Sequence, residues 1–257
     1  MERTLKAILA AVAILAMATA ATAAEKIRIG TEGAYPPFNF VDSAGNVQGF
    51  EVDLGNALCK VMRVECEWVV QDWDGIIPGL QSKKYDAIIA SLYITDERKQ
   101  KIDFSNKYYQ TPARFVARKG AGIEISTAGL KGKVVGLQRA TSFERYMNAE
   151  HPGVELRLYA TQDEVNLDMA AGRIDLVLAD TLALLEGFLK KPVGKDFEFI
   201  GPNLSDPRYF GYGAGVAVRK DSGDLVDRFN KAIAQIRADG TYEAIRKKWF
   251  DIDIWGG

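Results

Sequence analysis

Histidine and cysteine are scarce in this chain of 257 residues, which contains one histidine, His151, and two cysteines. Zinc and haem sites need several such side chains close together, and a serine-hydrolase triad needs a histidine beside its nucleophile. The sequence therefore gives no support to metal, haem or triad chemistry. We predict that the protein uses no metal and no cofactor.

A strong net charge is also missing, because 33 basic side chains are matched by 34 acidic ones and the formal charge is −1. Electrostatic binding to nucleic acid or anionic membranes usually requires a marked basic excess. We therefore expect no nucleic-acid partner. With 47% hydrophobic and 26% charged residues the composition is that of an ordinary globular protein, and the length suits one large or two modest domains.

Long apolar runs are confined to the N-terminus. Arg3 and Lys6 flank the start of the apolar run 7–18, which is too short to cross a bilayer, and residues 21–23 form a small-x-small cleavage pattern. We interpret residues 1–24 as a secretory signal that is cleaved near residues 23–24. The mature protein is then exported, with no direct insertion into a membrane.

Export changes the interpretation of the two cysteines. Cys59 and Cys66 are seven residues apart, one late in a predicted helix and the other at the start of a predicted strand. In an oxidising compartment such a pair favours a disulfide. Metal binding would need further ligands, and His151 is distant in sequence. We predict a Cys59–Cys66 disulfide.

Strand and helix patterns alternate in the first third of the mature chain. Strands are predicted at 26–31, 65–70 and 86–90, and helices at 54–62 and 75–82. This βαβαβ order predicts a largely parallel sheet, in which ligands bind beyond the carboxyl ends of the strands. Glu32, Tyr35, Trp73 and the segment 91–98 come directly after predicted strands. We expect them to converge on one edge.

A second α/β unit comes next, and the chain then returns. Strands are predicted at 114–119, 133–138, 154–159 and 174–179, and capping boxes at 141–144 and 161–164 open two helices. The tail contains a predicted strand at 213–218 and helices at 224–239 and 241–249. It is too small for a third domain, so we expect it to pack on the first lobe.

Arg98 is unusual because it is a cation near the positive end of a predicted helix. Thr95 suits the N-cap position, and Asp96 and Glu97 suit the first turn. An isolated arginine of this kind is commonly a surface residue. It also fits a site where an anion meets free backbone N–H groups and a guanidinium that grips a carboxylate in two places.

Motifs of one family succeed one another through almost the whole mature chain: GTEGAYPPF, GFEVDLGNALC, DWDGIIPGL, KKYDAIIASLYITDERKQKIDFS, GLQRATSFE, AGRIDLVLAD and DGTYEAIRKKWF. In this order they resemble the periplasmic solute-binding proteins of amino-acid ABC importers, and most closely the lysine-, arginine-, ornithine- and histidine-binding subfamily. The resemblance implies the two-lobe α/β fold of type II, with two hinge strands and a ligand in the cleft. Lobe 1 would comprise residues 25–111 and 209–257, and lobe 2 residues 112–208.

The resemblance also implies roles for the residues at the ends of the strands. Arg98 would bind the ligand α-carboxylate, helped by backbone N–H groups near Tyr93 and Ser142. Asp180, from the second lobe, would bind the α-ammonium together with a backbone carbonyl near Ser91. These assignments fit the ligand, because an amino acid presents one anion and one cation a few ångströms apart.

Three further residues would hold the ligand side chain. Tyr35 and Trp73 would sandwich its methylenes, and aromatic faces also attract cations. Glu32 would face its distal positive group. Less specific interpretations remain open: Asp180 as the N-cap of the helix that begins after it, Tyr35 and Trp73 as core aromatics, and Glu32 as a solvated loop carboxylate.

Two positions depart from the family pattern, and two neighbours are assigned to packing. Glu32 stands where lysine and arginine binders often have Asp, and Tyr93 stands where Ser often helps to hold the α-ammonium. We interpret Tyr108 and Tyr109 as packing near the hinge. The bulk of Tyr93 would narrow the cleft.

The resemblance implies a periplasmic, monomeric binding protein without enzyme activity that delivers its ligand to an ABC permease. The favoured ligand is a cationic L-amino acid: arginine, lysine, ornithine or histidine, with arginine slightly preferred. One alternative is a binding protein for an opine or another substituted amino acid. Another is an exported dehydratase acting on cyclohexadienyl acids, in which Glu32 or Asp180 would be the acid or base.

Overall fold

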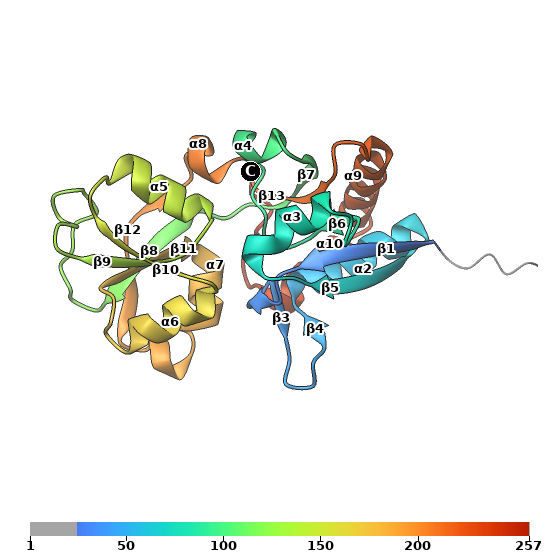
Figure 1. Cartoon of the computed structure of the whole chain (residues 1–257). Helices are drawn as coiled ribbons and strands as arrows, with labels where there is room; N and C mark the ends of the chain where they lie inside the picture. The colour runs from blue at the N-terminus through green and yellow to red at the C-terminus, as the bar shows by residue number, and fades with distance from the viewer. Residues whose placement is uncertain (1–24, 257) are drawn as a thin grey trace, which may run out of the picture.

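The computed structural model describes residues 25–256, which form two α/β lobes (Figure 1). Each lobe contains a five-stranded sheet, with strand order β5-β1-β6-β13-β7 in the first and β10-β9-β11-β8-β12 in the second. The two-lobe α/β architecture predicted from the sequence is therefore confirmed. The predicted signal sequence, residues 1–24, lies outside the described residues.

The first lobe is built around β1 (Lys26–Thr31), which pairs in parallel with β5 (Glu65–Val70) and β6 (Ala87–Ile88). β13 (Ala214–Val218) joins the same sheet from the far end of the chain and pairs antiparallel with β6 and with β7 (Asp103–Tyr109). Within this sheet β5, β1 and β6 are therefore parallel to one another, whereas β13 is antiparallel to both of its neighbours.

Helices pack on this sheet and bury their apolar residues. α2 (Phe50–Met62), α9 (Gly223–Ala238) and α10 (Thr241–Trp249) pack together, and α3 (Ile76–Gln81) contacts β1 and β6. The other elements of this lobe are β2 (Ala34–Tyr35), β3 (Asn39–Val41), β4 (Val47–Gln48), the 3₁₀ turn η1 (Trp73–Gly75) and α4 (Asp96–Lys99).

The second lobe contains β8 (Ala113–Arg118), β9 (Val134–Gln138), β10 (Glu155–Tyr159), β11 (Leu176–Asp180) and β12 (Phe197–Leu204). Its helices are α5 (Ser142–Glu150), α6 (Gln162–Ala170) and α7 (Thr181–Leu184), and then η2 (Leu185–Leu189), η3 (Pro192–Gly194) and α8 (Pro207–Phe210). β9, β10 and β11 run parallel, so the N-termini of α5 and α7 lie at the carboxyl ends of β9 and β11.

The two helix starts predicted as capping boxes differ. Thr161 and Glu164 form the complete reciprocal box. At α5 only half of it forms: Thr141 accepts from the Glu144 N–H, but the Glu144 carboxylate accepts from the N–H of Ala140. Ala140 has a φ of 57°.

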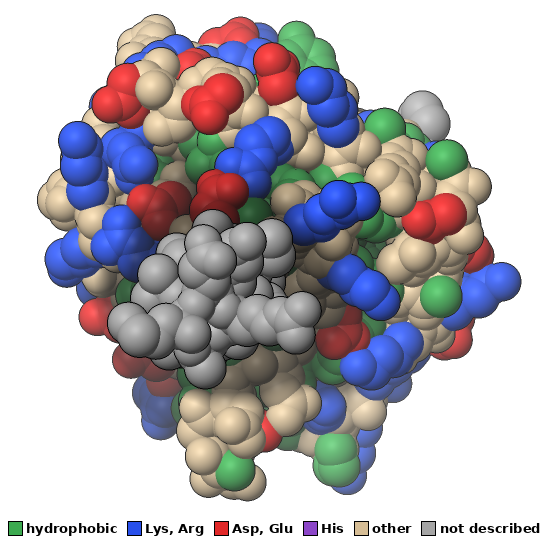
Figure 2. Space-filling view, turned by 90° about the vertical axis from the view of Figure 1, so that its right-hand side faces the viewer, with side chains coloured by type: hydrophobic (Ala, Val, Ile, Leu, Met, Phe, Trp, Pro, Cys, Tyr) green, Lys and Arg blue, Asp and Glu red, His purple; other side chains and the backbone are tan. Residues whose placement is uncertain are grey.

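The chain passes between the lobes twice, between β7 and β8 and again between β12 and β13. We propose the boundaries 25–111, 112–208 and 209–257 for the lobe segments. Among residues 25–256, no helix has the length and apolar character that a bilayer crossing requires. On the face shown in Figure 2, basic and acidic side chains are interspersed rather than gathered by sign.

The predicted disulfide is confirmed, with Cys59 and Cys66 joined by an S–S bond of 2.00 Å. It ties the last turn of α2 to β5, two elements that also pack against each other. A crosslink stabilises a fold largely by restricting the unfolded chain, and a loop this short contributes less than a long one.

Replacing both cysteines by alanine should therefore lower the free energy of unfolding by about 2 kcal/mol. Guanidinium chloride unfolding of the oxidised protein and of the Cys59→Ala/Cys66→Ala variant measures the difference. The oxidised protein treated with a reductant is the matched control and should unfold like the variant. An unchanged midpoint would show that the crosslink does not stabilise this fold.

Candidate ligand-binding site

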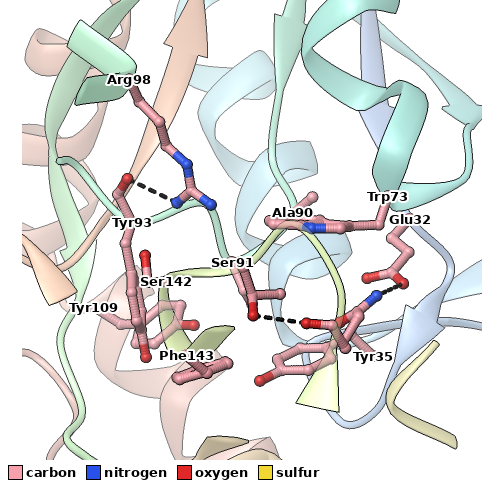
Figure 3. Close-up of a pocket in the computed structure, with 12 residues that line it drawn as sticks. Glu32, Tyr35, Trp73, Ala90, Ser91, Tyr93, Arg98, Tyr109, Ser142 and Phe143 are labelled. Carbon is pink, nitrogen blue, oxygen red and sulfur yellow. Dashed lines mark hydrogen bonds between the residues drawn. The ribbon is translucent and has the colours of Figure 1, made fainter. Parts of the chain in front are cut away.

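A cavity lies between the two lobes, at the edge where the predicted residues converge (Figure 3). Seven of the eight predicted ligand-binding residues line it: Glu32, Tyr35, Trp73, Ser91, Tyr93, Arg98 and Ser142. The eighth, Asp180, does not line the cavity. Five residues that were not predicted to bind ligand also line it: Ala90, Tyr109, Gln138, Thr141 and Phe143.

Arg98 is oriented by the start of α4. The Thr95 hydroxyl accepts from the Arg98 N–H at 3.3 Å, which caps the helix as predicted. The guanidinium donates to the Tyr93 carbonyl at 3.1 Å and lies 5.5 Å from the centre of the Trp73 ring. Burial lowers the pKa of Arg98 to about 10, with a smaller contribution from Arg145, so it stays charged at neutral pH. Its partner here is a carbonyl, so donors remain for an anion.

Trp73 and Tyr35 lie on opposite sides of the cavity in Figure 3. Trp73 begins η1 directly beyond β5, and its indole N–H donates to the Ala140 carbonyl of the second lobe at 3.3 Å. Tyr35 is almost fully buried and stacks on Phe38 with 5.9 Å between ring centres. Both rings line the cavity. The sandwiching role of these residues stays a prediction.

Glu32 comes directly after β1 and is 6% exposed. Its carboxylate accepts from the Gln138 side-chain amide, at the end of β9 in the second lobe, over 2.6 Å. Burial raises the pKa of Glu32 to about 7, although the bond from Gln138 opposes this shift. Glu32 is therefore a buried acid poised near neutral pH and not a solvated loop carboxylate.

The loop carrying Ser91 is held by Glu51, a buried residue of α2. The Glu51 carboxylate accepts from the Ser91 N–H at 2.6 Å, from the Tyr108 hydroxyl at 2.5 Å and from the Asn39 amide at 2.7 Å. Ser91 has a φ of 52°, and β6 ends at Ile88, two residues earlier than the sequence pattern predicts. Sequence reasoning did not identify Glu51.

The first turn of α5 provides the wall of the second lobe. Thr141 is its N-cap, and Ser142 and Phe143 are its first two residues. Backbone N–H groups at a helix start attract negative charge. This agrees with the prediction that an anion binds near Ser142 and Arg98.

Asp180 is placed differently from the prediction. It is 1% exposed, and one carboxylate oxygen accepts from the N–H groups of Leu182 and Ala183 at 2.8 and 3.4 Å, as the N-cap of α7. The other oxygen accepts from the Tyr93 hydroxyl at 2.9 Å and from the Thr111 hydroxyl. The capping interpretation is therefore correct. The phenol of Tyr93 stands between Asp180 and the cavity.

Gln138 carries a sequence signal for the site, whereas Tyr109 was assigned to packing. Gln138 ends a predicted strand, and the rule that singled out Glu32 as a residue after a strand applies to it as well. Tyr109 ends β7 and is fully buried, yet it lines the cavity, and its hydroxyl has no hydrogen-bond partner among the described residues. The assignment of Tyr109 to packing alone was therefore incomplete.

Ion pairs join the lobes at the rim of the cavity. Arg139 contacts Asp74 and Arg145 contacts Glu97, each at 2.5 Å. Both arginines come from the second lobe and both acids from the first. These pairs are partly exposed, so each contributes little to stability by itself.

The family model of bacterial extracellular solute-binding proteins, family 3, matches residues 27–252. The chain belongs to this family. An L-arginine-binding protein of Pseudomonas aeruginosa is 49% identical over 97% of this chain and 98% of its own length. The lysine/arginine/ornithine-binding periplasmic protein of Escherichia coli is 47% identical over 98% of this chain and 99% of its own length.

Solved structures of relatives share the fold. A Salmonella typhimurium periplasmic binding protein described as having high arginine specificity superposes with a TM-score of 0.81 at 36% identity, over 88% of this chain and all of that one. A His/Glu/Gln/Arg/opine family-binding protein of Silicibacter pomeroyi, in complex with lysine, gives 0.79 at 38% identity, over 90% of this chain and all of that one. The type II two-lobe fold is therefore shown.

The Glu51 network generates a prediction for stability. In Glu51→Gln the amide has one acceptor oxygen, so at least one buried donor among Ser91, Tyr108 and Asn39 loses its partner. This should lower the free energy of unfolding by about 1–3 kcal/mol. Denaturant unfolding measures the loss, and Glu67→Gln, at an exposed position on β5, should change it by less than about 0.5 kcal/mol. Equal stability of the two variants would contradict the assigned role of Glu51.

Proposed function

We propose that this protein binds a cationic L-amino acid in the periplasm and delivers it to an ABC permease. The candidate ligands are arginine, lysine, ornithine and histidine, with arginine slightly favoured. One observation carries the proposal: Arg98 and Glu32 line the same cavity at opposite sides, with Trp73 and Tyr35 between them (Figure 3). This matches a ligand with a carboxylate at one end, methylenes in the middle and a cation at the other end.

Closure of the lobes couples binding to delivery. Glu32 and Gln138 belong to different lobes, and so do Trp73 and Ala140, so the ligand contacts both walls. A ligand that binds the closed form better shifts the population toward it. A micromolar Kd corresponds to about −8 kcal/mol, which a bidentate arginine, a carboxylate and two aromatic walls can supply. The closed monomer would then present both lobes to the permease.

The names of the relatives support binding rather than catalysis. A cyclohexadienyl-type dehydratase acts on a dianionic acid, and a second cation at the far side of the cavity would favour it. The cavity instead has Glu32 there, and Arg98 is the cation among its lining residues. An opine-type ligand is the second candidate. The Tyr93 hydroxyl already donates to the Asp180 carboxylate, to which the α-ammonium was predicted to bind.

A thermal-shift screen of refolded, ligand-stripped protein tests the proposed class. Amino acids, opines, prephenate and arogenate are compared, and a ligand at about 100 times its Kd should add about 2.7 kcal/mol of stability. We expect shifts with the cationic compounds. Shifts confined to prephenate or arogenate would refute the binding of cationic amino acids.

Arg98→Ala should weaken arginine binding by about thirtyfold or more, because truncating one partner of a buried charge pair costs about 2–5 kcal/mol. Isothermal titration calorimetry measures the change in Kd. Arg118→Ala, at the exposed end of β8, is the matched control and should bind like the native protein. Retained affinity in Arg98→Ala would exclude this guanidinium as the carboxylate-binding group.

Arginine binding should weaken as the pH falls below 7. The pKa of Glu32 is raised to about 7 in the free protein, so at lower pH a ligand cation must displace a proton before it can pair with the carboxylate. The Kd should rise by up to tenfold for each unit below pH 7, since one pKa unit corresponds to a factor of ten. Arginine is a suitable probe because its guanidinium does not titrate in this range.

Glu32→Gln should bind arginine more weakly at pH 8 and lose most of this pH dependence, and glutamine binding should change less. Titrations at pH 5, 6, 7 and 8 with both proteins measure this. If the native protein binds arginine equally at pH 5 and pH 8, Glu32 does not pair with the ligand cation.

A further inference from the structure

The cavity carries two charged side chains, and their balance limits the ligands that it can hold. Of the twelve lining residues, Arg98 is the cation and Glu32 is the acid. Their charges match a ligand with one carboxylate and one distal cation. L-arginine carries a third charge, the α-ammonium, and Asp180 is the residue predicted to balance it.

Asp180 has no free acceptor position for an ammonium. A carboxylate offers about four lone-pair sites, and the four donors here are the N–H groups of Leu182 and Ala183 and the hydroxyls of Tyr93 and Thr111. An ammonium can reach Asp180 only if a hydroxyl leaves. The N-cap bonds also hold the carboxylate in place.

Tyr93 fills the space between Asp180 and the cavity. It is 5% exposed, its ring packs edge-on against Phe143 with 6.1 Å between centres, and its carbonyl accepts from Arg98. The ring is therefore held from the second lobe at its edge and from Asp180 at its hydroxyl. A serine at this position would leave that space open.

Tyr109 adds a second phenol to the same wall. Its hydroxyl is fully buried, belongs to a residue that lines the cavity, and has no partner among the described residues. A phenol can donate to a ligand oxygen, whereas for an ammonium it is a weaker partner than a carboxylate. This wall therefore suits an uncharged or oxygen-bearing part of a ligand.

We propose that Tyr93 determines specificity at the α-carbon of the ligand by occupying Asp180. The α-ammonium then forms no ion pair, and the ligand class extends to ω-guanidino and ω-amino carboxylic acids that have no α-ammonium. Such compounds bind as tightly as the corresponding amino acids or more tightly. This inference rests on the proposed function, because it keeps the carboxylate on Arg98 and the distal cation on Glu32.

The test compares L-arginine with 5-guanidinopentanoate, which has the same chain and lacks only the α-ammonium. Calorimetric titration of the native protein should give Kd values within about threefold of each other, or tighter binding of 5-guanidinopentanoate. If Asp180 accepted the ammonium, its loss would weaken binding by about thirtyfold or more. A native preference of that size for L-arginine would overturn the inference and leave the proposed function standing.

Two variants distinguish the effect of the Tyr93 ring, which fills the space before Asp180, from the effect of the Tyr93 hydroxyl. Tyr93→Ser frees Asp180 and should create a preference for L-arginine of about thirtyfold or more. Tyr93→Phe removes the hydroxyl from Asp180 but keeps the ring in the space before it, and should raise the preference for L-arginine less than Tyr93→Ser does. Equal ratios in Tyr93→Ser and the native protein would overturn the inference. Failure of both compounds to bind the native protein would refute the proposed function, and this inference with it.

Discussion

The cavity depends on one buried carboxylate, that of Glu51. It accepts hydrogen bonds from β3, from the loop after β6 and from β7, so three segments that are distant in sequence meet at one side chain. The bond to the Ser91 N–H stabilises a φ of 52°, a conformation that few non-glycine residues adopt. That turn lies between β6 and the segment that carries Tyr93 and Arg98.

Side chains that are proposed to bind the ligand also join the two lobes. Glu32 bonds to Gln138, Trp73 to Ala140 and Tyr93 to Asp180, and each bond joins the first lobe to the second. Under the proposed function, a ligand cation at Glu32 would share or replace the Gln138 amide, and binding would change the contacts that hold the lobes together. Such coupling is expected of a site at the junction of two lobes, because each wall would present only part of the ligand contacts.

The prediction and the structure differ in the second lobe, at Asp180. The ligand role of Asp180 was implied by the family resemblance, and Asp180 does end β11. The same position also begins α7, so its carboxylate caps that helix. Whether it also faces the cavity depended on Tyr93, which comes from the other lobe. The sequence around Asp180 does not indicate that a side chain from the other lobe covers it.

The sequence by itself determined the two-lobe α/β fold, the Cys59–Cys66 disulfide and most residues of the cavity wall. Hydrophobic periodicity and helix caps act over a few residues, and the carboxyl ends of parallel strands bring the loops beyond them to one edge of the sheet. Only the tertiary structure decided the occupancy of Asp180, the exposure of Tyr109 to the cavity and the raised pKa of Glu32. Each depends on groups distant in sequence or on burial between lobes, and such contacts leave no periodic trace in the chain.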